Sequence, residues 1–205
     1  MNRYLTAVKA ALFLLLLVPF VLIILDGVQD NLTADPIEEI LHRTGLWSLR
    51  ILLITLLMTP LKVLTGSALF IRLRRMLGLF TFFYASMHLL VYVWLDLGLD
   101  WAHFFEDVIE RPYITVGMLA WLLMLPMAIT SNRHMVRKLG QKWKRLHQSI
   151  YLVIGLGCLH FLWLVKSDVT EPLIYTGIGL TLLLFRIIHH KHVQRKARIA
   201  QSSRS

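Results

Sequence analysis

The sequence predicts an all-α integral membrane bundle of six transmembrane helices with both termini in the cytoplasm. Hydrophobic residues make up 57% of the 205 residues, and charged residues only 17%. The mean hydropathy is +0.63, and soluble domains carry a larger charged fraction than this chain does. Six apolar stretches are long enough to cross a hydrocarbon core of roughly 30 Å. These observations together favour a membrane protein over a soluble one.

The first predicted span has the basic residues Arg3 and Lys9 ahead of its apolar run, as a secretory signal does. It lacks a small-x-small cleavage site and runs into Asp26 and Gly27. We therefore expect it to be retained as a membrane helix. In chain order, the six expected spans lie at about 7–25, 46–64, 76–95, 113–131, 146–165 and 172–188.

The other spans differ in which charged, proline or histidine residues interrupt their apolar runs. The second has Arg50 near its start and Pro60 near its end, whereas the third contains no Asp, Glu, Lys or Arg. The fifth has a histidine at each end, and the sixth is followed by a basic stretch. We expect one six-helix transmembrane domain over residues 1–190 and a basic cytoplasmic tail over 191–205.

The charges are segregated if the six spans alternate in direction. All but four of the 22 Lys and Arg residues then share one side, and all 12 acidic residues fall on the other. The positive-inside rule places the basic side, and both termini, in the cytoplasm. The same distribution explains the formal charge of +10 without nucleic acid, for which no motif is present. The four exceptions are Arg43, Arg50, Arg111 and Lys166.

The chain has a single cysteine, Cys158, inside the fifth span. A disulfide within the chain is therefore excluded, and the lack of a Cys-x-x-Cys-His motif excludes covalent haem attachment of the c type. We expect Cys158 to be a small packing residue, and any haem to be bound non-covalently as haem b.

Three histidines fall inside predicted spans, where an ionisable side chain is costly and usually marks a function. At 1.5 Å per residue, His88 lies roughly 18 Å into the third span, and His160 lies roughly 20 Å beyond His147 in the fifth. His88 and His160 therefore share a depth, where two neutral imidazoles from facing helices can supply both axial ligands of one haem iron. The alternative is that each is a polar core residue hydrogen-bonded to a neighbouring carbonyl.

His147 lies about four turns below His160, near the cytoplasmic surface. No histidine stands at the matching depth of the third span, which instead carries Arg72, Arg74 and Arg75. In an ideal helix His147 and His160 point about 140° apart, unless a kink at Gly155 or Gly157 changes the angle. The remaining six histidines fall in predicted loops or the tail, where we expect solvent exposure: His42, His103, His134, His189, His190 and His192.

The order and spacing of these residues resemble the MsrQ family, the haem-binding membrane subunits of bacterial periplasmic methionine sulfoxide reductase systems. That family is part of the ferric reductase and NADPH oxidase transmembrane group. The resemblance covers nearly the whole chain and rests on an ordered set of short motifs rather than on one of them. The motifs are Ala34-Asp35-Pro36, His42-Arg43-Thr44-Gly45, Thr59-Pro60, Arg74-Arg75-x-Leu77-Gly78-Leu79, Arg111-Pro112-Tyr113, Thr130-Ser131, Leu139-Gly140-x-x-Trp143-x-x-Leu146-His147, His160-x-x-Trp163 and Pro172-Leu173-Ile174-Tyr175.

By this resemblance His88, His147 and His160 correspond to the haem-associated histidines of the family. The resemblance implies one or two haem b groups, with FMN as a further candidate cofactor. It implies an electron-transfer subunit rather than a catalytic one, which passes electrons to MsrP, a periplasmic molybdenum-containing reductase that repairs oxidised methionines. The implied donor is the quinol pool or a cytoplasmic flavin reductase.

The residues themselves leave open what the arginines near the third span hold. Arg74 and Arg75, with Arg72, suit a haem propionate, a flavin phosphate or an acidic donor protein, and the topology signal alone would also place them there. No loop exceeds about 20 residues, and a nucleotide-binding βαβ unit needs ~30. We therefore expect the chain not to oxidise NADPH by itself.

Two other functions compete with an electron relay to a protein partner. One is a stand-alone transmembrane ferric or quinone reductase. The other is a proton-coupled transporter, which predicts acidic groups at mid-membrane, yet every Asp and Glu lies outside the expected spans. The visible spectrum of the purified protein separates the transporter from the two reductases.

Overall fold

The computed structural model describes residues 3–165 and 167–202, and its regular elements over these ranges are helices. Six of the helical segments are long and apolar enough to cross a membrane, so the predicted fold class is confirmed. Many large apolar side chains on their outer faces are exposed, which suits contact with lipid. The chain is thus a multi-pass membrane protein. Lys166 and residues 203–205 lie outside the described residues.

The helices extend beyond most of the predicted spans, because a search for apolar runs does not detect the polar turns at the helix ends. Two further helices lie outside the predicted spans, α4 and α6, and the helix of the sixth span continues past residue 190 through most of the basic stretch. The elements are α1 (Arg3–Val28), α2 (Pro36–Thr65), α3 (Leu69–Val91) with a π-helical continuation η1 (Tyr92–Asp96), α4 (Trp101–Glu110), α5 (Pro112–Ile129), α6 (Arg133–Leu139), α7 (Gln141–Gln148), α8 (Ile150–Leu164) and α9 (Thr170–Ser202).

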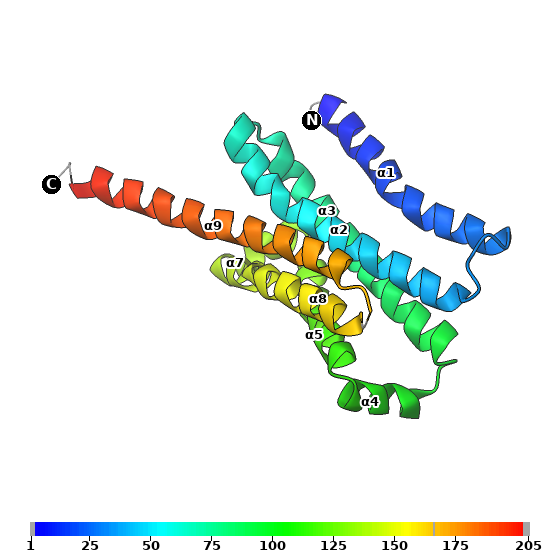
Figure 1. The fold of residues 1–205 in the computed structure, drawn as a ribbon. Helices are drawn as coiled ribbons and strands as arrows, with labels where there is room; N and C mark the ends of the chain where they lie inside the picture. The colour runs from blue at the N-terminus through cyan, green and yellow to red at the C-terminus, as the bar shows by residue number, and fades with distance from the viewer. Residues whose placement is uncertain (1–2, 166, 203–205) are drawn as a thin grey trace.

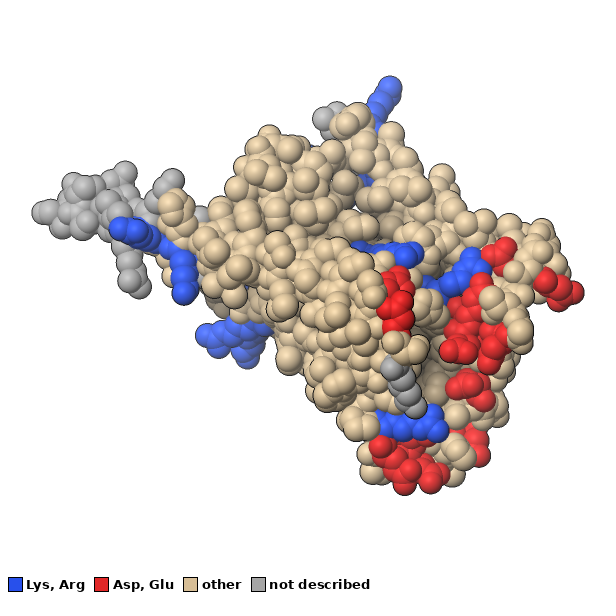
Figure 2. Space-filling model, in the orientation of Figure 1, with Lys and Arg blue, Asp and Glu red and all other residues tan. Residues whose placement is uncertain are grey.

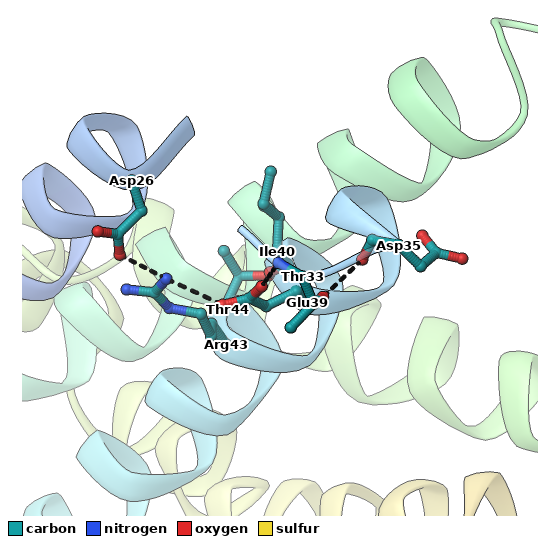
Figure 3. Close-up of polar contacts among 7 residues, drawn as sticks. All are labelled: Asp26, Thr33, Asp35, Glu39, Ile40, Arg43 and Thr44. Atoms are coloured by element: carbon teal, nitrogen blue, oxygen red, sulfur yellow. Dashed lines mark hydrogen bonds and ion pairs between the residues drawn. The ribbon is translucent and has the colours of Figure 1, made fainter. Parts of the chain in front are cut away.

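The N-terminal turns of α2 were expected to be a loop, yet local signals make them helical. Asp35 is the N-cap and accepts a hydrogen bond from the backbone N–H of Glu38, while Pro36 occupies the first turn. Figure 3 shows how this segment is tied to α1: Arg43 bonds Asp26 at 2.7 Å and Glu39 at 3.3 Å. These contacts hold the α1–α2 connection against the end of the bundle.

The central element of the bundle is α2, which contributes to both hydrophobic cores. One core joins α2 to α5 and α8, and the other joins α2 to α1 and α3. Figure 1 shows the same arrangement, with α1 beside α2 and α3, and α5, α8 and α9 on the other side. Ile51, in the second core, has no exposed surface, and Leu52 beside it belongs to the first. Both faces of α2 are therefore buried.

A tyrosine of α3 inserts into the backbone of α1. The hydroxyl of Tyr84 donates to the carbonyl of Leu16 at 2.7 Å and accepts from the N–H of Phe20 at 3.1 Å. These are the two groups that an unbroken helix pairs with each other, and the neighbouring Pro19 already removes one donor from this turn. Tyr84 is completely buried. This contact therefore fixes where α1 docks on the bundle.

The two ends of the bundle carry opposite charges. We call the end with the α1–α2 connection, η1, α4 and the α8–α9 connection the acidic end, because all 12 acidic residues lie within 26–39, 96–110 and 168–171. The basic end comprises the start of α1, the α2–α3 turn, α6 and α7. Figure 2 shows the acidic side chains gathered at one end, where some Lys and Arg lie among them, while the other Lys and Arg in this view lie away from that end. The charge segregation expected from the sequence is therefore present in space.

Candidate functional site

A cavity of about 500 Å³ lies inside the bundle, toward the acidic end. Its walls come from α2, α3, α5 and α8, and its size is within the range of small-molecule and cofactor sites. Most of the lining is apolar, but two histidines, His88 and His160, face each other across it. The mouth carries polar groups that include His42, Tyr92 and Arg111.

His88 on α3 is held by the backbone of α2. Its Nδ1 lies 2.9 Å from the carbonyl oxygen of Leu41. One turn further along α2, Gly45 gives the ring room, because a Cβ there would stand 3.1 Å from the same Nδ1. A carbonyl oxygen only accepts hydrogen bonds, so Nδ1 carries the proton and neutral Nε2 keeps its lone pair.

His160 on α8 is held by α5 in the same way. Its Nδ1 lies 2.7 Å from the carbonyl oxygen of Tyr113, and a Cβ on Gly117 would stand only 2.7 Å from that Nδ1. In both pairs 47 residues separate the histidine from its carbonyl partner. Two helix pairs, α2 with α3 and α5 with α8, therefore present an imidazole by the same local construction.

The distance between the two rings suits a metal ion bound between them. The ring centres of His88 and His160 are 6.0 Å apart and their planes are 84° apart. Two opposed imidazoles, each bound to a metal at about 2 Å, have ring centres roughly 6 Å apart. The expected pairing of these two residues at one depth is thus seen in space. The alternative hydrogen bond to a carbonyl is present as well, but it uses only one nitrogen of each ring.

His147 does not join this cavity. It lies on α7 at the basic end, where its ring stacks on Trp143 at 3.9 Å and its Nε2 lies 3.3 Å from the hydroxyl of Thr130. The fifth span is interrupted at Ser149, between α7 and α8, while α8 continues through Gly155 and Gly157. Ser149 keeps right-handed helical dihedrals and bonds the carbonyl of Leu146 at 3.1 Å, so the irregularity in this span lies nearer to His147 than the two glycines do.

The arginines of α3 also lie away from the cavity. Arg74 precedes His88 by 14 residues, which is roughly 21 Å along a helix. Arg74 is half-buried, whereas Arg72 and Arg75 are exposed. Among the described residues, the arginine that lines the cavity is instead Arg111, which precedes α5 at the acidic end.

Arg111 is fixed at the cavity mouth by α4. Its Nε bonds the buried carboxylate of Asp107 at 2.9 Å, and the hydroxyl of Tyr92 donates to the same carboxylate at 2.5 Å. A hydrogen bond with the Tyr113 side chain and the charge of Asp107 raise the pKa of Arg111, so its guanidinium stays charged. Tyr92 belongs to the π-helical segment η1, a distortion that is frequent at functional sites.

Sequence reasoning missed several residues of this site. His42 was placed in a loop, but it lies on α2, lines the cavity and is exposed as expected, with Nε2 3.8 Å from Glu171. Gly45 and Gly117 were not identified as site residues, although Gly117 lies within a predicted apolar span, where a glycine is a signal for close packing. The other histidines whose side chains are described lie away from the cavity: His103 on α4, His134 on α6, and His189 and His192 on α9.

Comparison with known proteins gives a consistent result. The family model for the ferric reductase like transmembrane component matches residues 44–158, which include His88 and His147 and end two residues before His160. The chain is 58% identical over 159 residues to the protein-methionine-sulfoxide reductase heme-binding subunit MsrQ of Xanthomonas campestris pv. campestris (strain B100), covering 78% of this chain and 73% of that protein. It is 46% identical over 170 residues to the protein of the same name from Brucella anthropi, covering 83% and 77%. No solved structure matches the chain.

Proposed function

This chain belongs to the MsrQ family of ferric reductase-like membrane proteins, and we propose that it is the haem-binding subunit of a methionine sulfoxide reductase system. The proposed function is electron transfer across the membrane to a catalytic partner, which makes the chain part of an oxidoreductase rather than its catalytic subunit. The observation that carries this proposal is the pair His88 and His160, whose rings lie 6.0 Å apart in the cavity.

We assign His88 and His160 as the two residues that would hold a non-covalent haem b. A haem iron held by these two imidazoles would supply one-electron transfer rather than oxygen binding. The carbonyls of Leu41 and Tyr113 keep each Nδ1 protonated and thereby direct Nε2 to the metal. The apolar wall excludes water, and Trp121 in that wall is fixed by its Nε1–H bond to Ser86 at 3.0 Å.

We propose that His147, Arg74 and Arg75 help to bind a second cofactor at the basic end. His147 is placed there by its contacts with Trp143 and Thr130, and Arg74 lies within electrostatic range of it. This region suits a second haem or FMN, which the family resemblance allows. The two-haem alternative requires a second ligand beside His147, whose contacts among the described residues are Trp143 and Thr130.

We propose that the chain lies in the bacterial inner membrane with the basic end, and both termini, in the cytoplasm. In this orientation residues 1–190 form the ferric reductase-like transmembrane domain, and 191–205 form a basic cytoplasmic tail that contacts anionic lipid. The acidic end then faces the periplasm, where the partner is the molybdenum-containing reductase MsrP. The donor at the cytoplasmic side is the quinol pool or a soluble flavin reductase.

Haem quantification of the purified protein tests the site assignment. We expect His88→Ala and His160→Ala to lose the same haem, and the double variant to lose no more than either single one. His147→Ala is expected to lose a different fraction or none. His103→Ala is the matched control, because His103 is exposed on α4. Full haem content after removal of both His88 and His160 would contradict the assignment.

The partner is tested separately, with membranes that contain the haem-loaded protein. Electrons from a quinol or from a flavin reductase with NADH should reach added MsrP and support the reduction of methionine sulfoxide. A stand-alone ferric or quinone reductase would reduce its small acceptor equally well without MsrP and would transfer nothing to it. That result would remove the proposed partner and leave the haem site intact.

A further inference from the structure

The short helix α4 lies at the acidic end of the bundle, between η1 and α5 (Figure 1). One face of α4 packs against the protein. Phe104 and Asp107 on this face are buried, and both contact Tyr92 of η1, the first through its ring and the second through a hydrogen bond. The hydroxyl of Thr115 in α5 also donates to the carbonyl of Val108. These contacts fix the directions in which the other faces of α4 point.

A second face of α4 is an exposed apolar stripe. Trp101, Phe105 and Ile109 recur every four residues, so they lie along one side of the helix. Their exposed fractions are 57%, 61% and 81%, a large outward-facing apolar area for a helix of ten residues. An apolar patch of this kind marks a surface that contacts another protein or a membrane. The stripe is therefore expected to have a partner.

The third face of α4 is polar. Glu106 and Glu110 lie four residues apart, and His103 precedes Glu106 by three, so these exposed side chains share another side of the helix. With 3.6 residues per turn, the centre of this face stands roughly 130° from the centre of the apolar stripe. A helix that lies in a membrane surface has this division between an apolar side and a polar side.

The lengths of the neighbouring spans place α4 at the boundary of the membrane. Only Arg111 separates α4 from α5, whose 18 residues are about 27 Å long. A hydrocarbon core of about 30 Å therefore begins close to Pro112, where α5 starts. On the other side, the continuous segment Leu69–Asp96 has 28 residues, or about 42 Å, which is enough to reach the headgroup region. Four residues then lead to α4, which lies at this level.

Two observations favour lipid over a second protein as the partner of the stripe. The first is continuity, because Leu90 and Trp94 in the last turns of the adjacent span are also exposed, and tryptophan is typical of the boundary between lipid and water. The second is the level of α4. A protein partner would have to enter the headgroup layer to cover the stripe, whereas lipid already surrounds the bundle there.

We propose that α4 lies in the surface of the membrane, with Trp101, Phe105 and Ile109 inserted among the lipids and with Glu106 and Glu110 in water. The insertion depends on apolar burial, since α4 contains no Lys or Arg that would attract an anionic headgroup. The partner of this face is therefore a lipid surface, and a zwitterionic lipid is sufficient.

The position of α4 matters for the cavity, because Asp107 on its inner face bonds Arg111 at the cavity mouth. Lipid on one face of α4 and protein on another thus hold the same helix in place. The inference does not depend on which cofactor the cavity binds or on which protein receives the electrons. A failure of the haem assignment and a failure of the lipid contact are therefore observed separately.

Spin labels on single cysteines test where the two outer faces of α4 point. Cys158→Ala first removes the one natural cysteine of the full chain. One cysteine is then added at a time, on the apolar stripe by Phe105→Cys or Ile109→Cys and on the polar face by Glu106→Cys or Glu110→Cys. Each labelled protein is placed in nanodiscs of phosphatidylcholine. Electron paramagnetic resonance then measures its collisions with oxygen, which concentrates in lipid, and with a nickel chelate, which stays in water.

We expect the ratio of oxygen to nickel collisions to be several-fold higher for Phe105→Cys and Ile109→Cys than for Glu106→Cys and Glu110→Cys. The lipid reference is Leu122→Cys, at an exposed position in the middle of α5, and the two stripe variants should approach its ratio. Size-exclusion profiles identify any variant that fails to fold, and Trp101→Cys then replaces it on the stripe.

Two results would overturn the proposal. If the stripe variants meet the nickel chelate as often as the polar-face variants do, the stripe faces water and lipid does not cover it. If both reagents are excluded from the stripe, another protein molecule covers it.

Discussion

Replacing Gly117 with alanine tests whether the backbone of α5 sets the position of the His160 ring. The added Cβ would lie 2.7 Å from Nδ1 and 2.9 Å from Cε1 of that ring. Ordinary contacts of a Cβ begin at 3.4 Å, so the ring would have to retreat by about 0.7 Å (3.4 − 2.7). That movement also strains the 2.7 Å hydrogen bond to the carbonyl of Tyr113.

The expected loss of haem affinity in Gly117→Ala follows from the close contact with the ring and from the weakened hydrogen bond. Overpacking a tight contact costs about 1–3 kcal/mol, and weakening the hydrogen bond adds up to about 1 kcal/mol. If this total of about 1–4 kcal/mol falls on the haem-bound state, haem binds roughly 5- to 700-fold more weakly, at 1.4 kcal/mol for each factor of ten. The same substitution at Gly45 leaves a Cβ 3.1 Å from the His88 ring, so a retreat of only about 0.3 Å (3.4 − 3.1) is needed. Its effect should be smaller.

The assay is the ratio of haem to protein after purification, together with the electron paramagnetic resonance spectrum of the oxidised, low-spin haem. The spectrum reports the orientation of the axial rings, which a general loss of stability does not change. Gly78→Ala and Gly155→Ala are matched controls, because a Cβ at either helical glycine meets nothing within 4 Å. We expect the loss of haem to be largest in Gly117→Ala, smaller in Gly45→Ala and smallest in the two controls. If Gly117→Ala matches Gly155→Ala in both haem content and spectrum, the reasoning is wrong.

Three further substitutions test contacts that position the site. Tyr84→Phe removes the hydroxyl that bonds two backbone groups of α1. It should lower the free energy of unfolding by about 1–3 kcal/mol, which is measured as a lower Tm with no change in the haem spectrum. An unchanged Tm would contradict this. Asp107→Asn removes the charge that holds Arg111 and should increase hydrogen exchange in α4 first, while exchange at the basic end stays the same. Arg43→Gln breaks two partly exposed ion pairs. It should lower the free energy of unfolding by less than about 1 kcal/mol at low salt and by nothing measurable at 1 M salt. A larger loss of stability that persists at high salt would refute this.

The spans and the level shared by His88 and His160 could be predicted from the sequence, because both depend only on the rise along a rigid helix. The predicted depths agreed to within one turn, and the rings lie 6.0 Å apart. Which carbonyl each ring would meet could not be predicted. That depends on the rotation of α2 against α3 and of α5 against α8, which is set by packing across helices.

The other differences have similar causes. A search for long apolar runs does not detect α4 or α6, since α4 is amphipathic and α6 has only seven residues. The break at Ser149 has no proline or glycine at that residue to signal it.

The bridge made by Tyr84 has a consequence for the order of assembly in the cell. The chain is synthesised from its N-terminus, so α1 enters the membrane before residue 84 exists. Until then the carbonyl of Leu16 and the N–H of Phe20 can pair only within α1, since lipid offers them no partner. The bond between Leu16 and Phe20 can therefore form within α1 at first, and α1 takes its final place only when the third crossing has been inserted beside it.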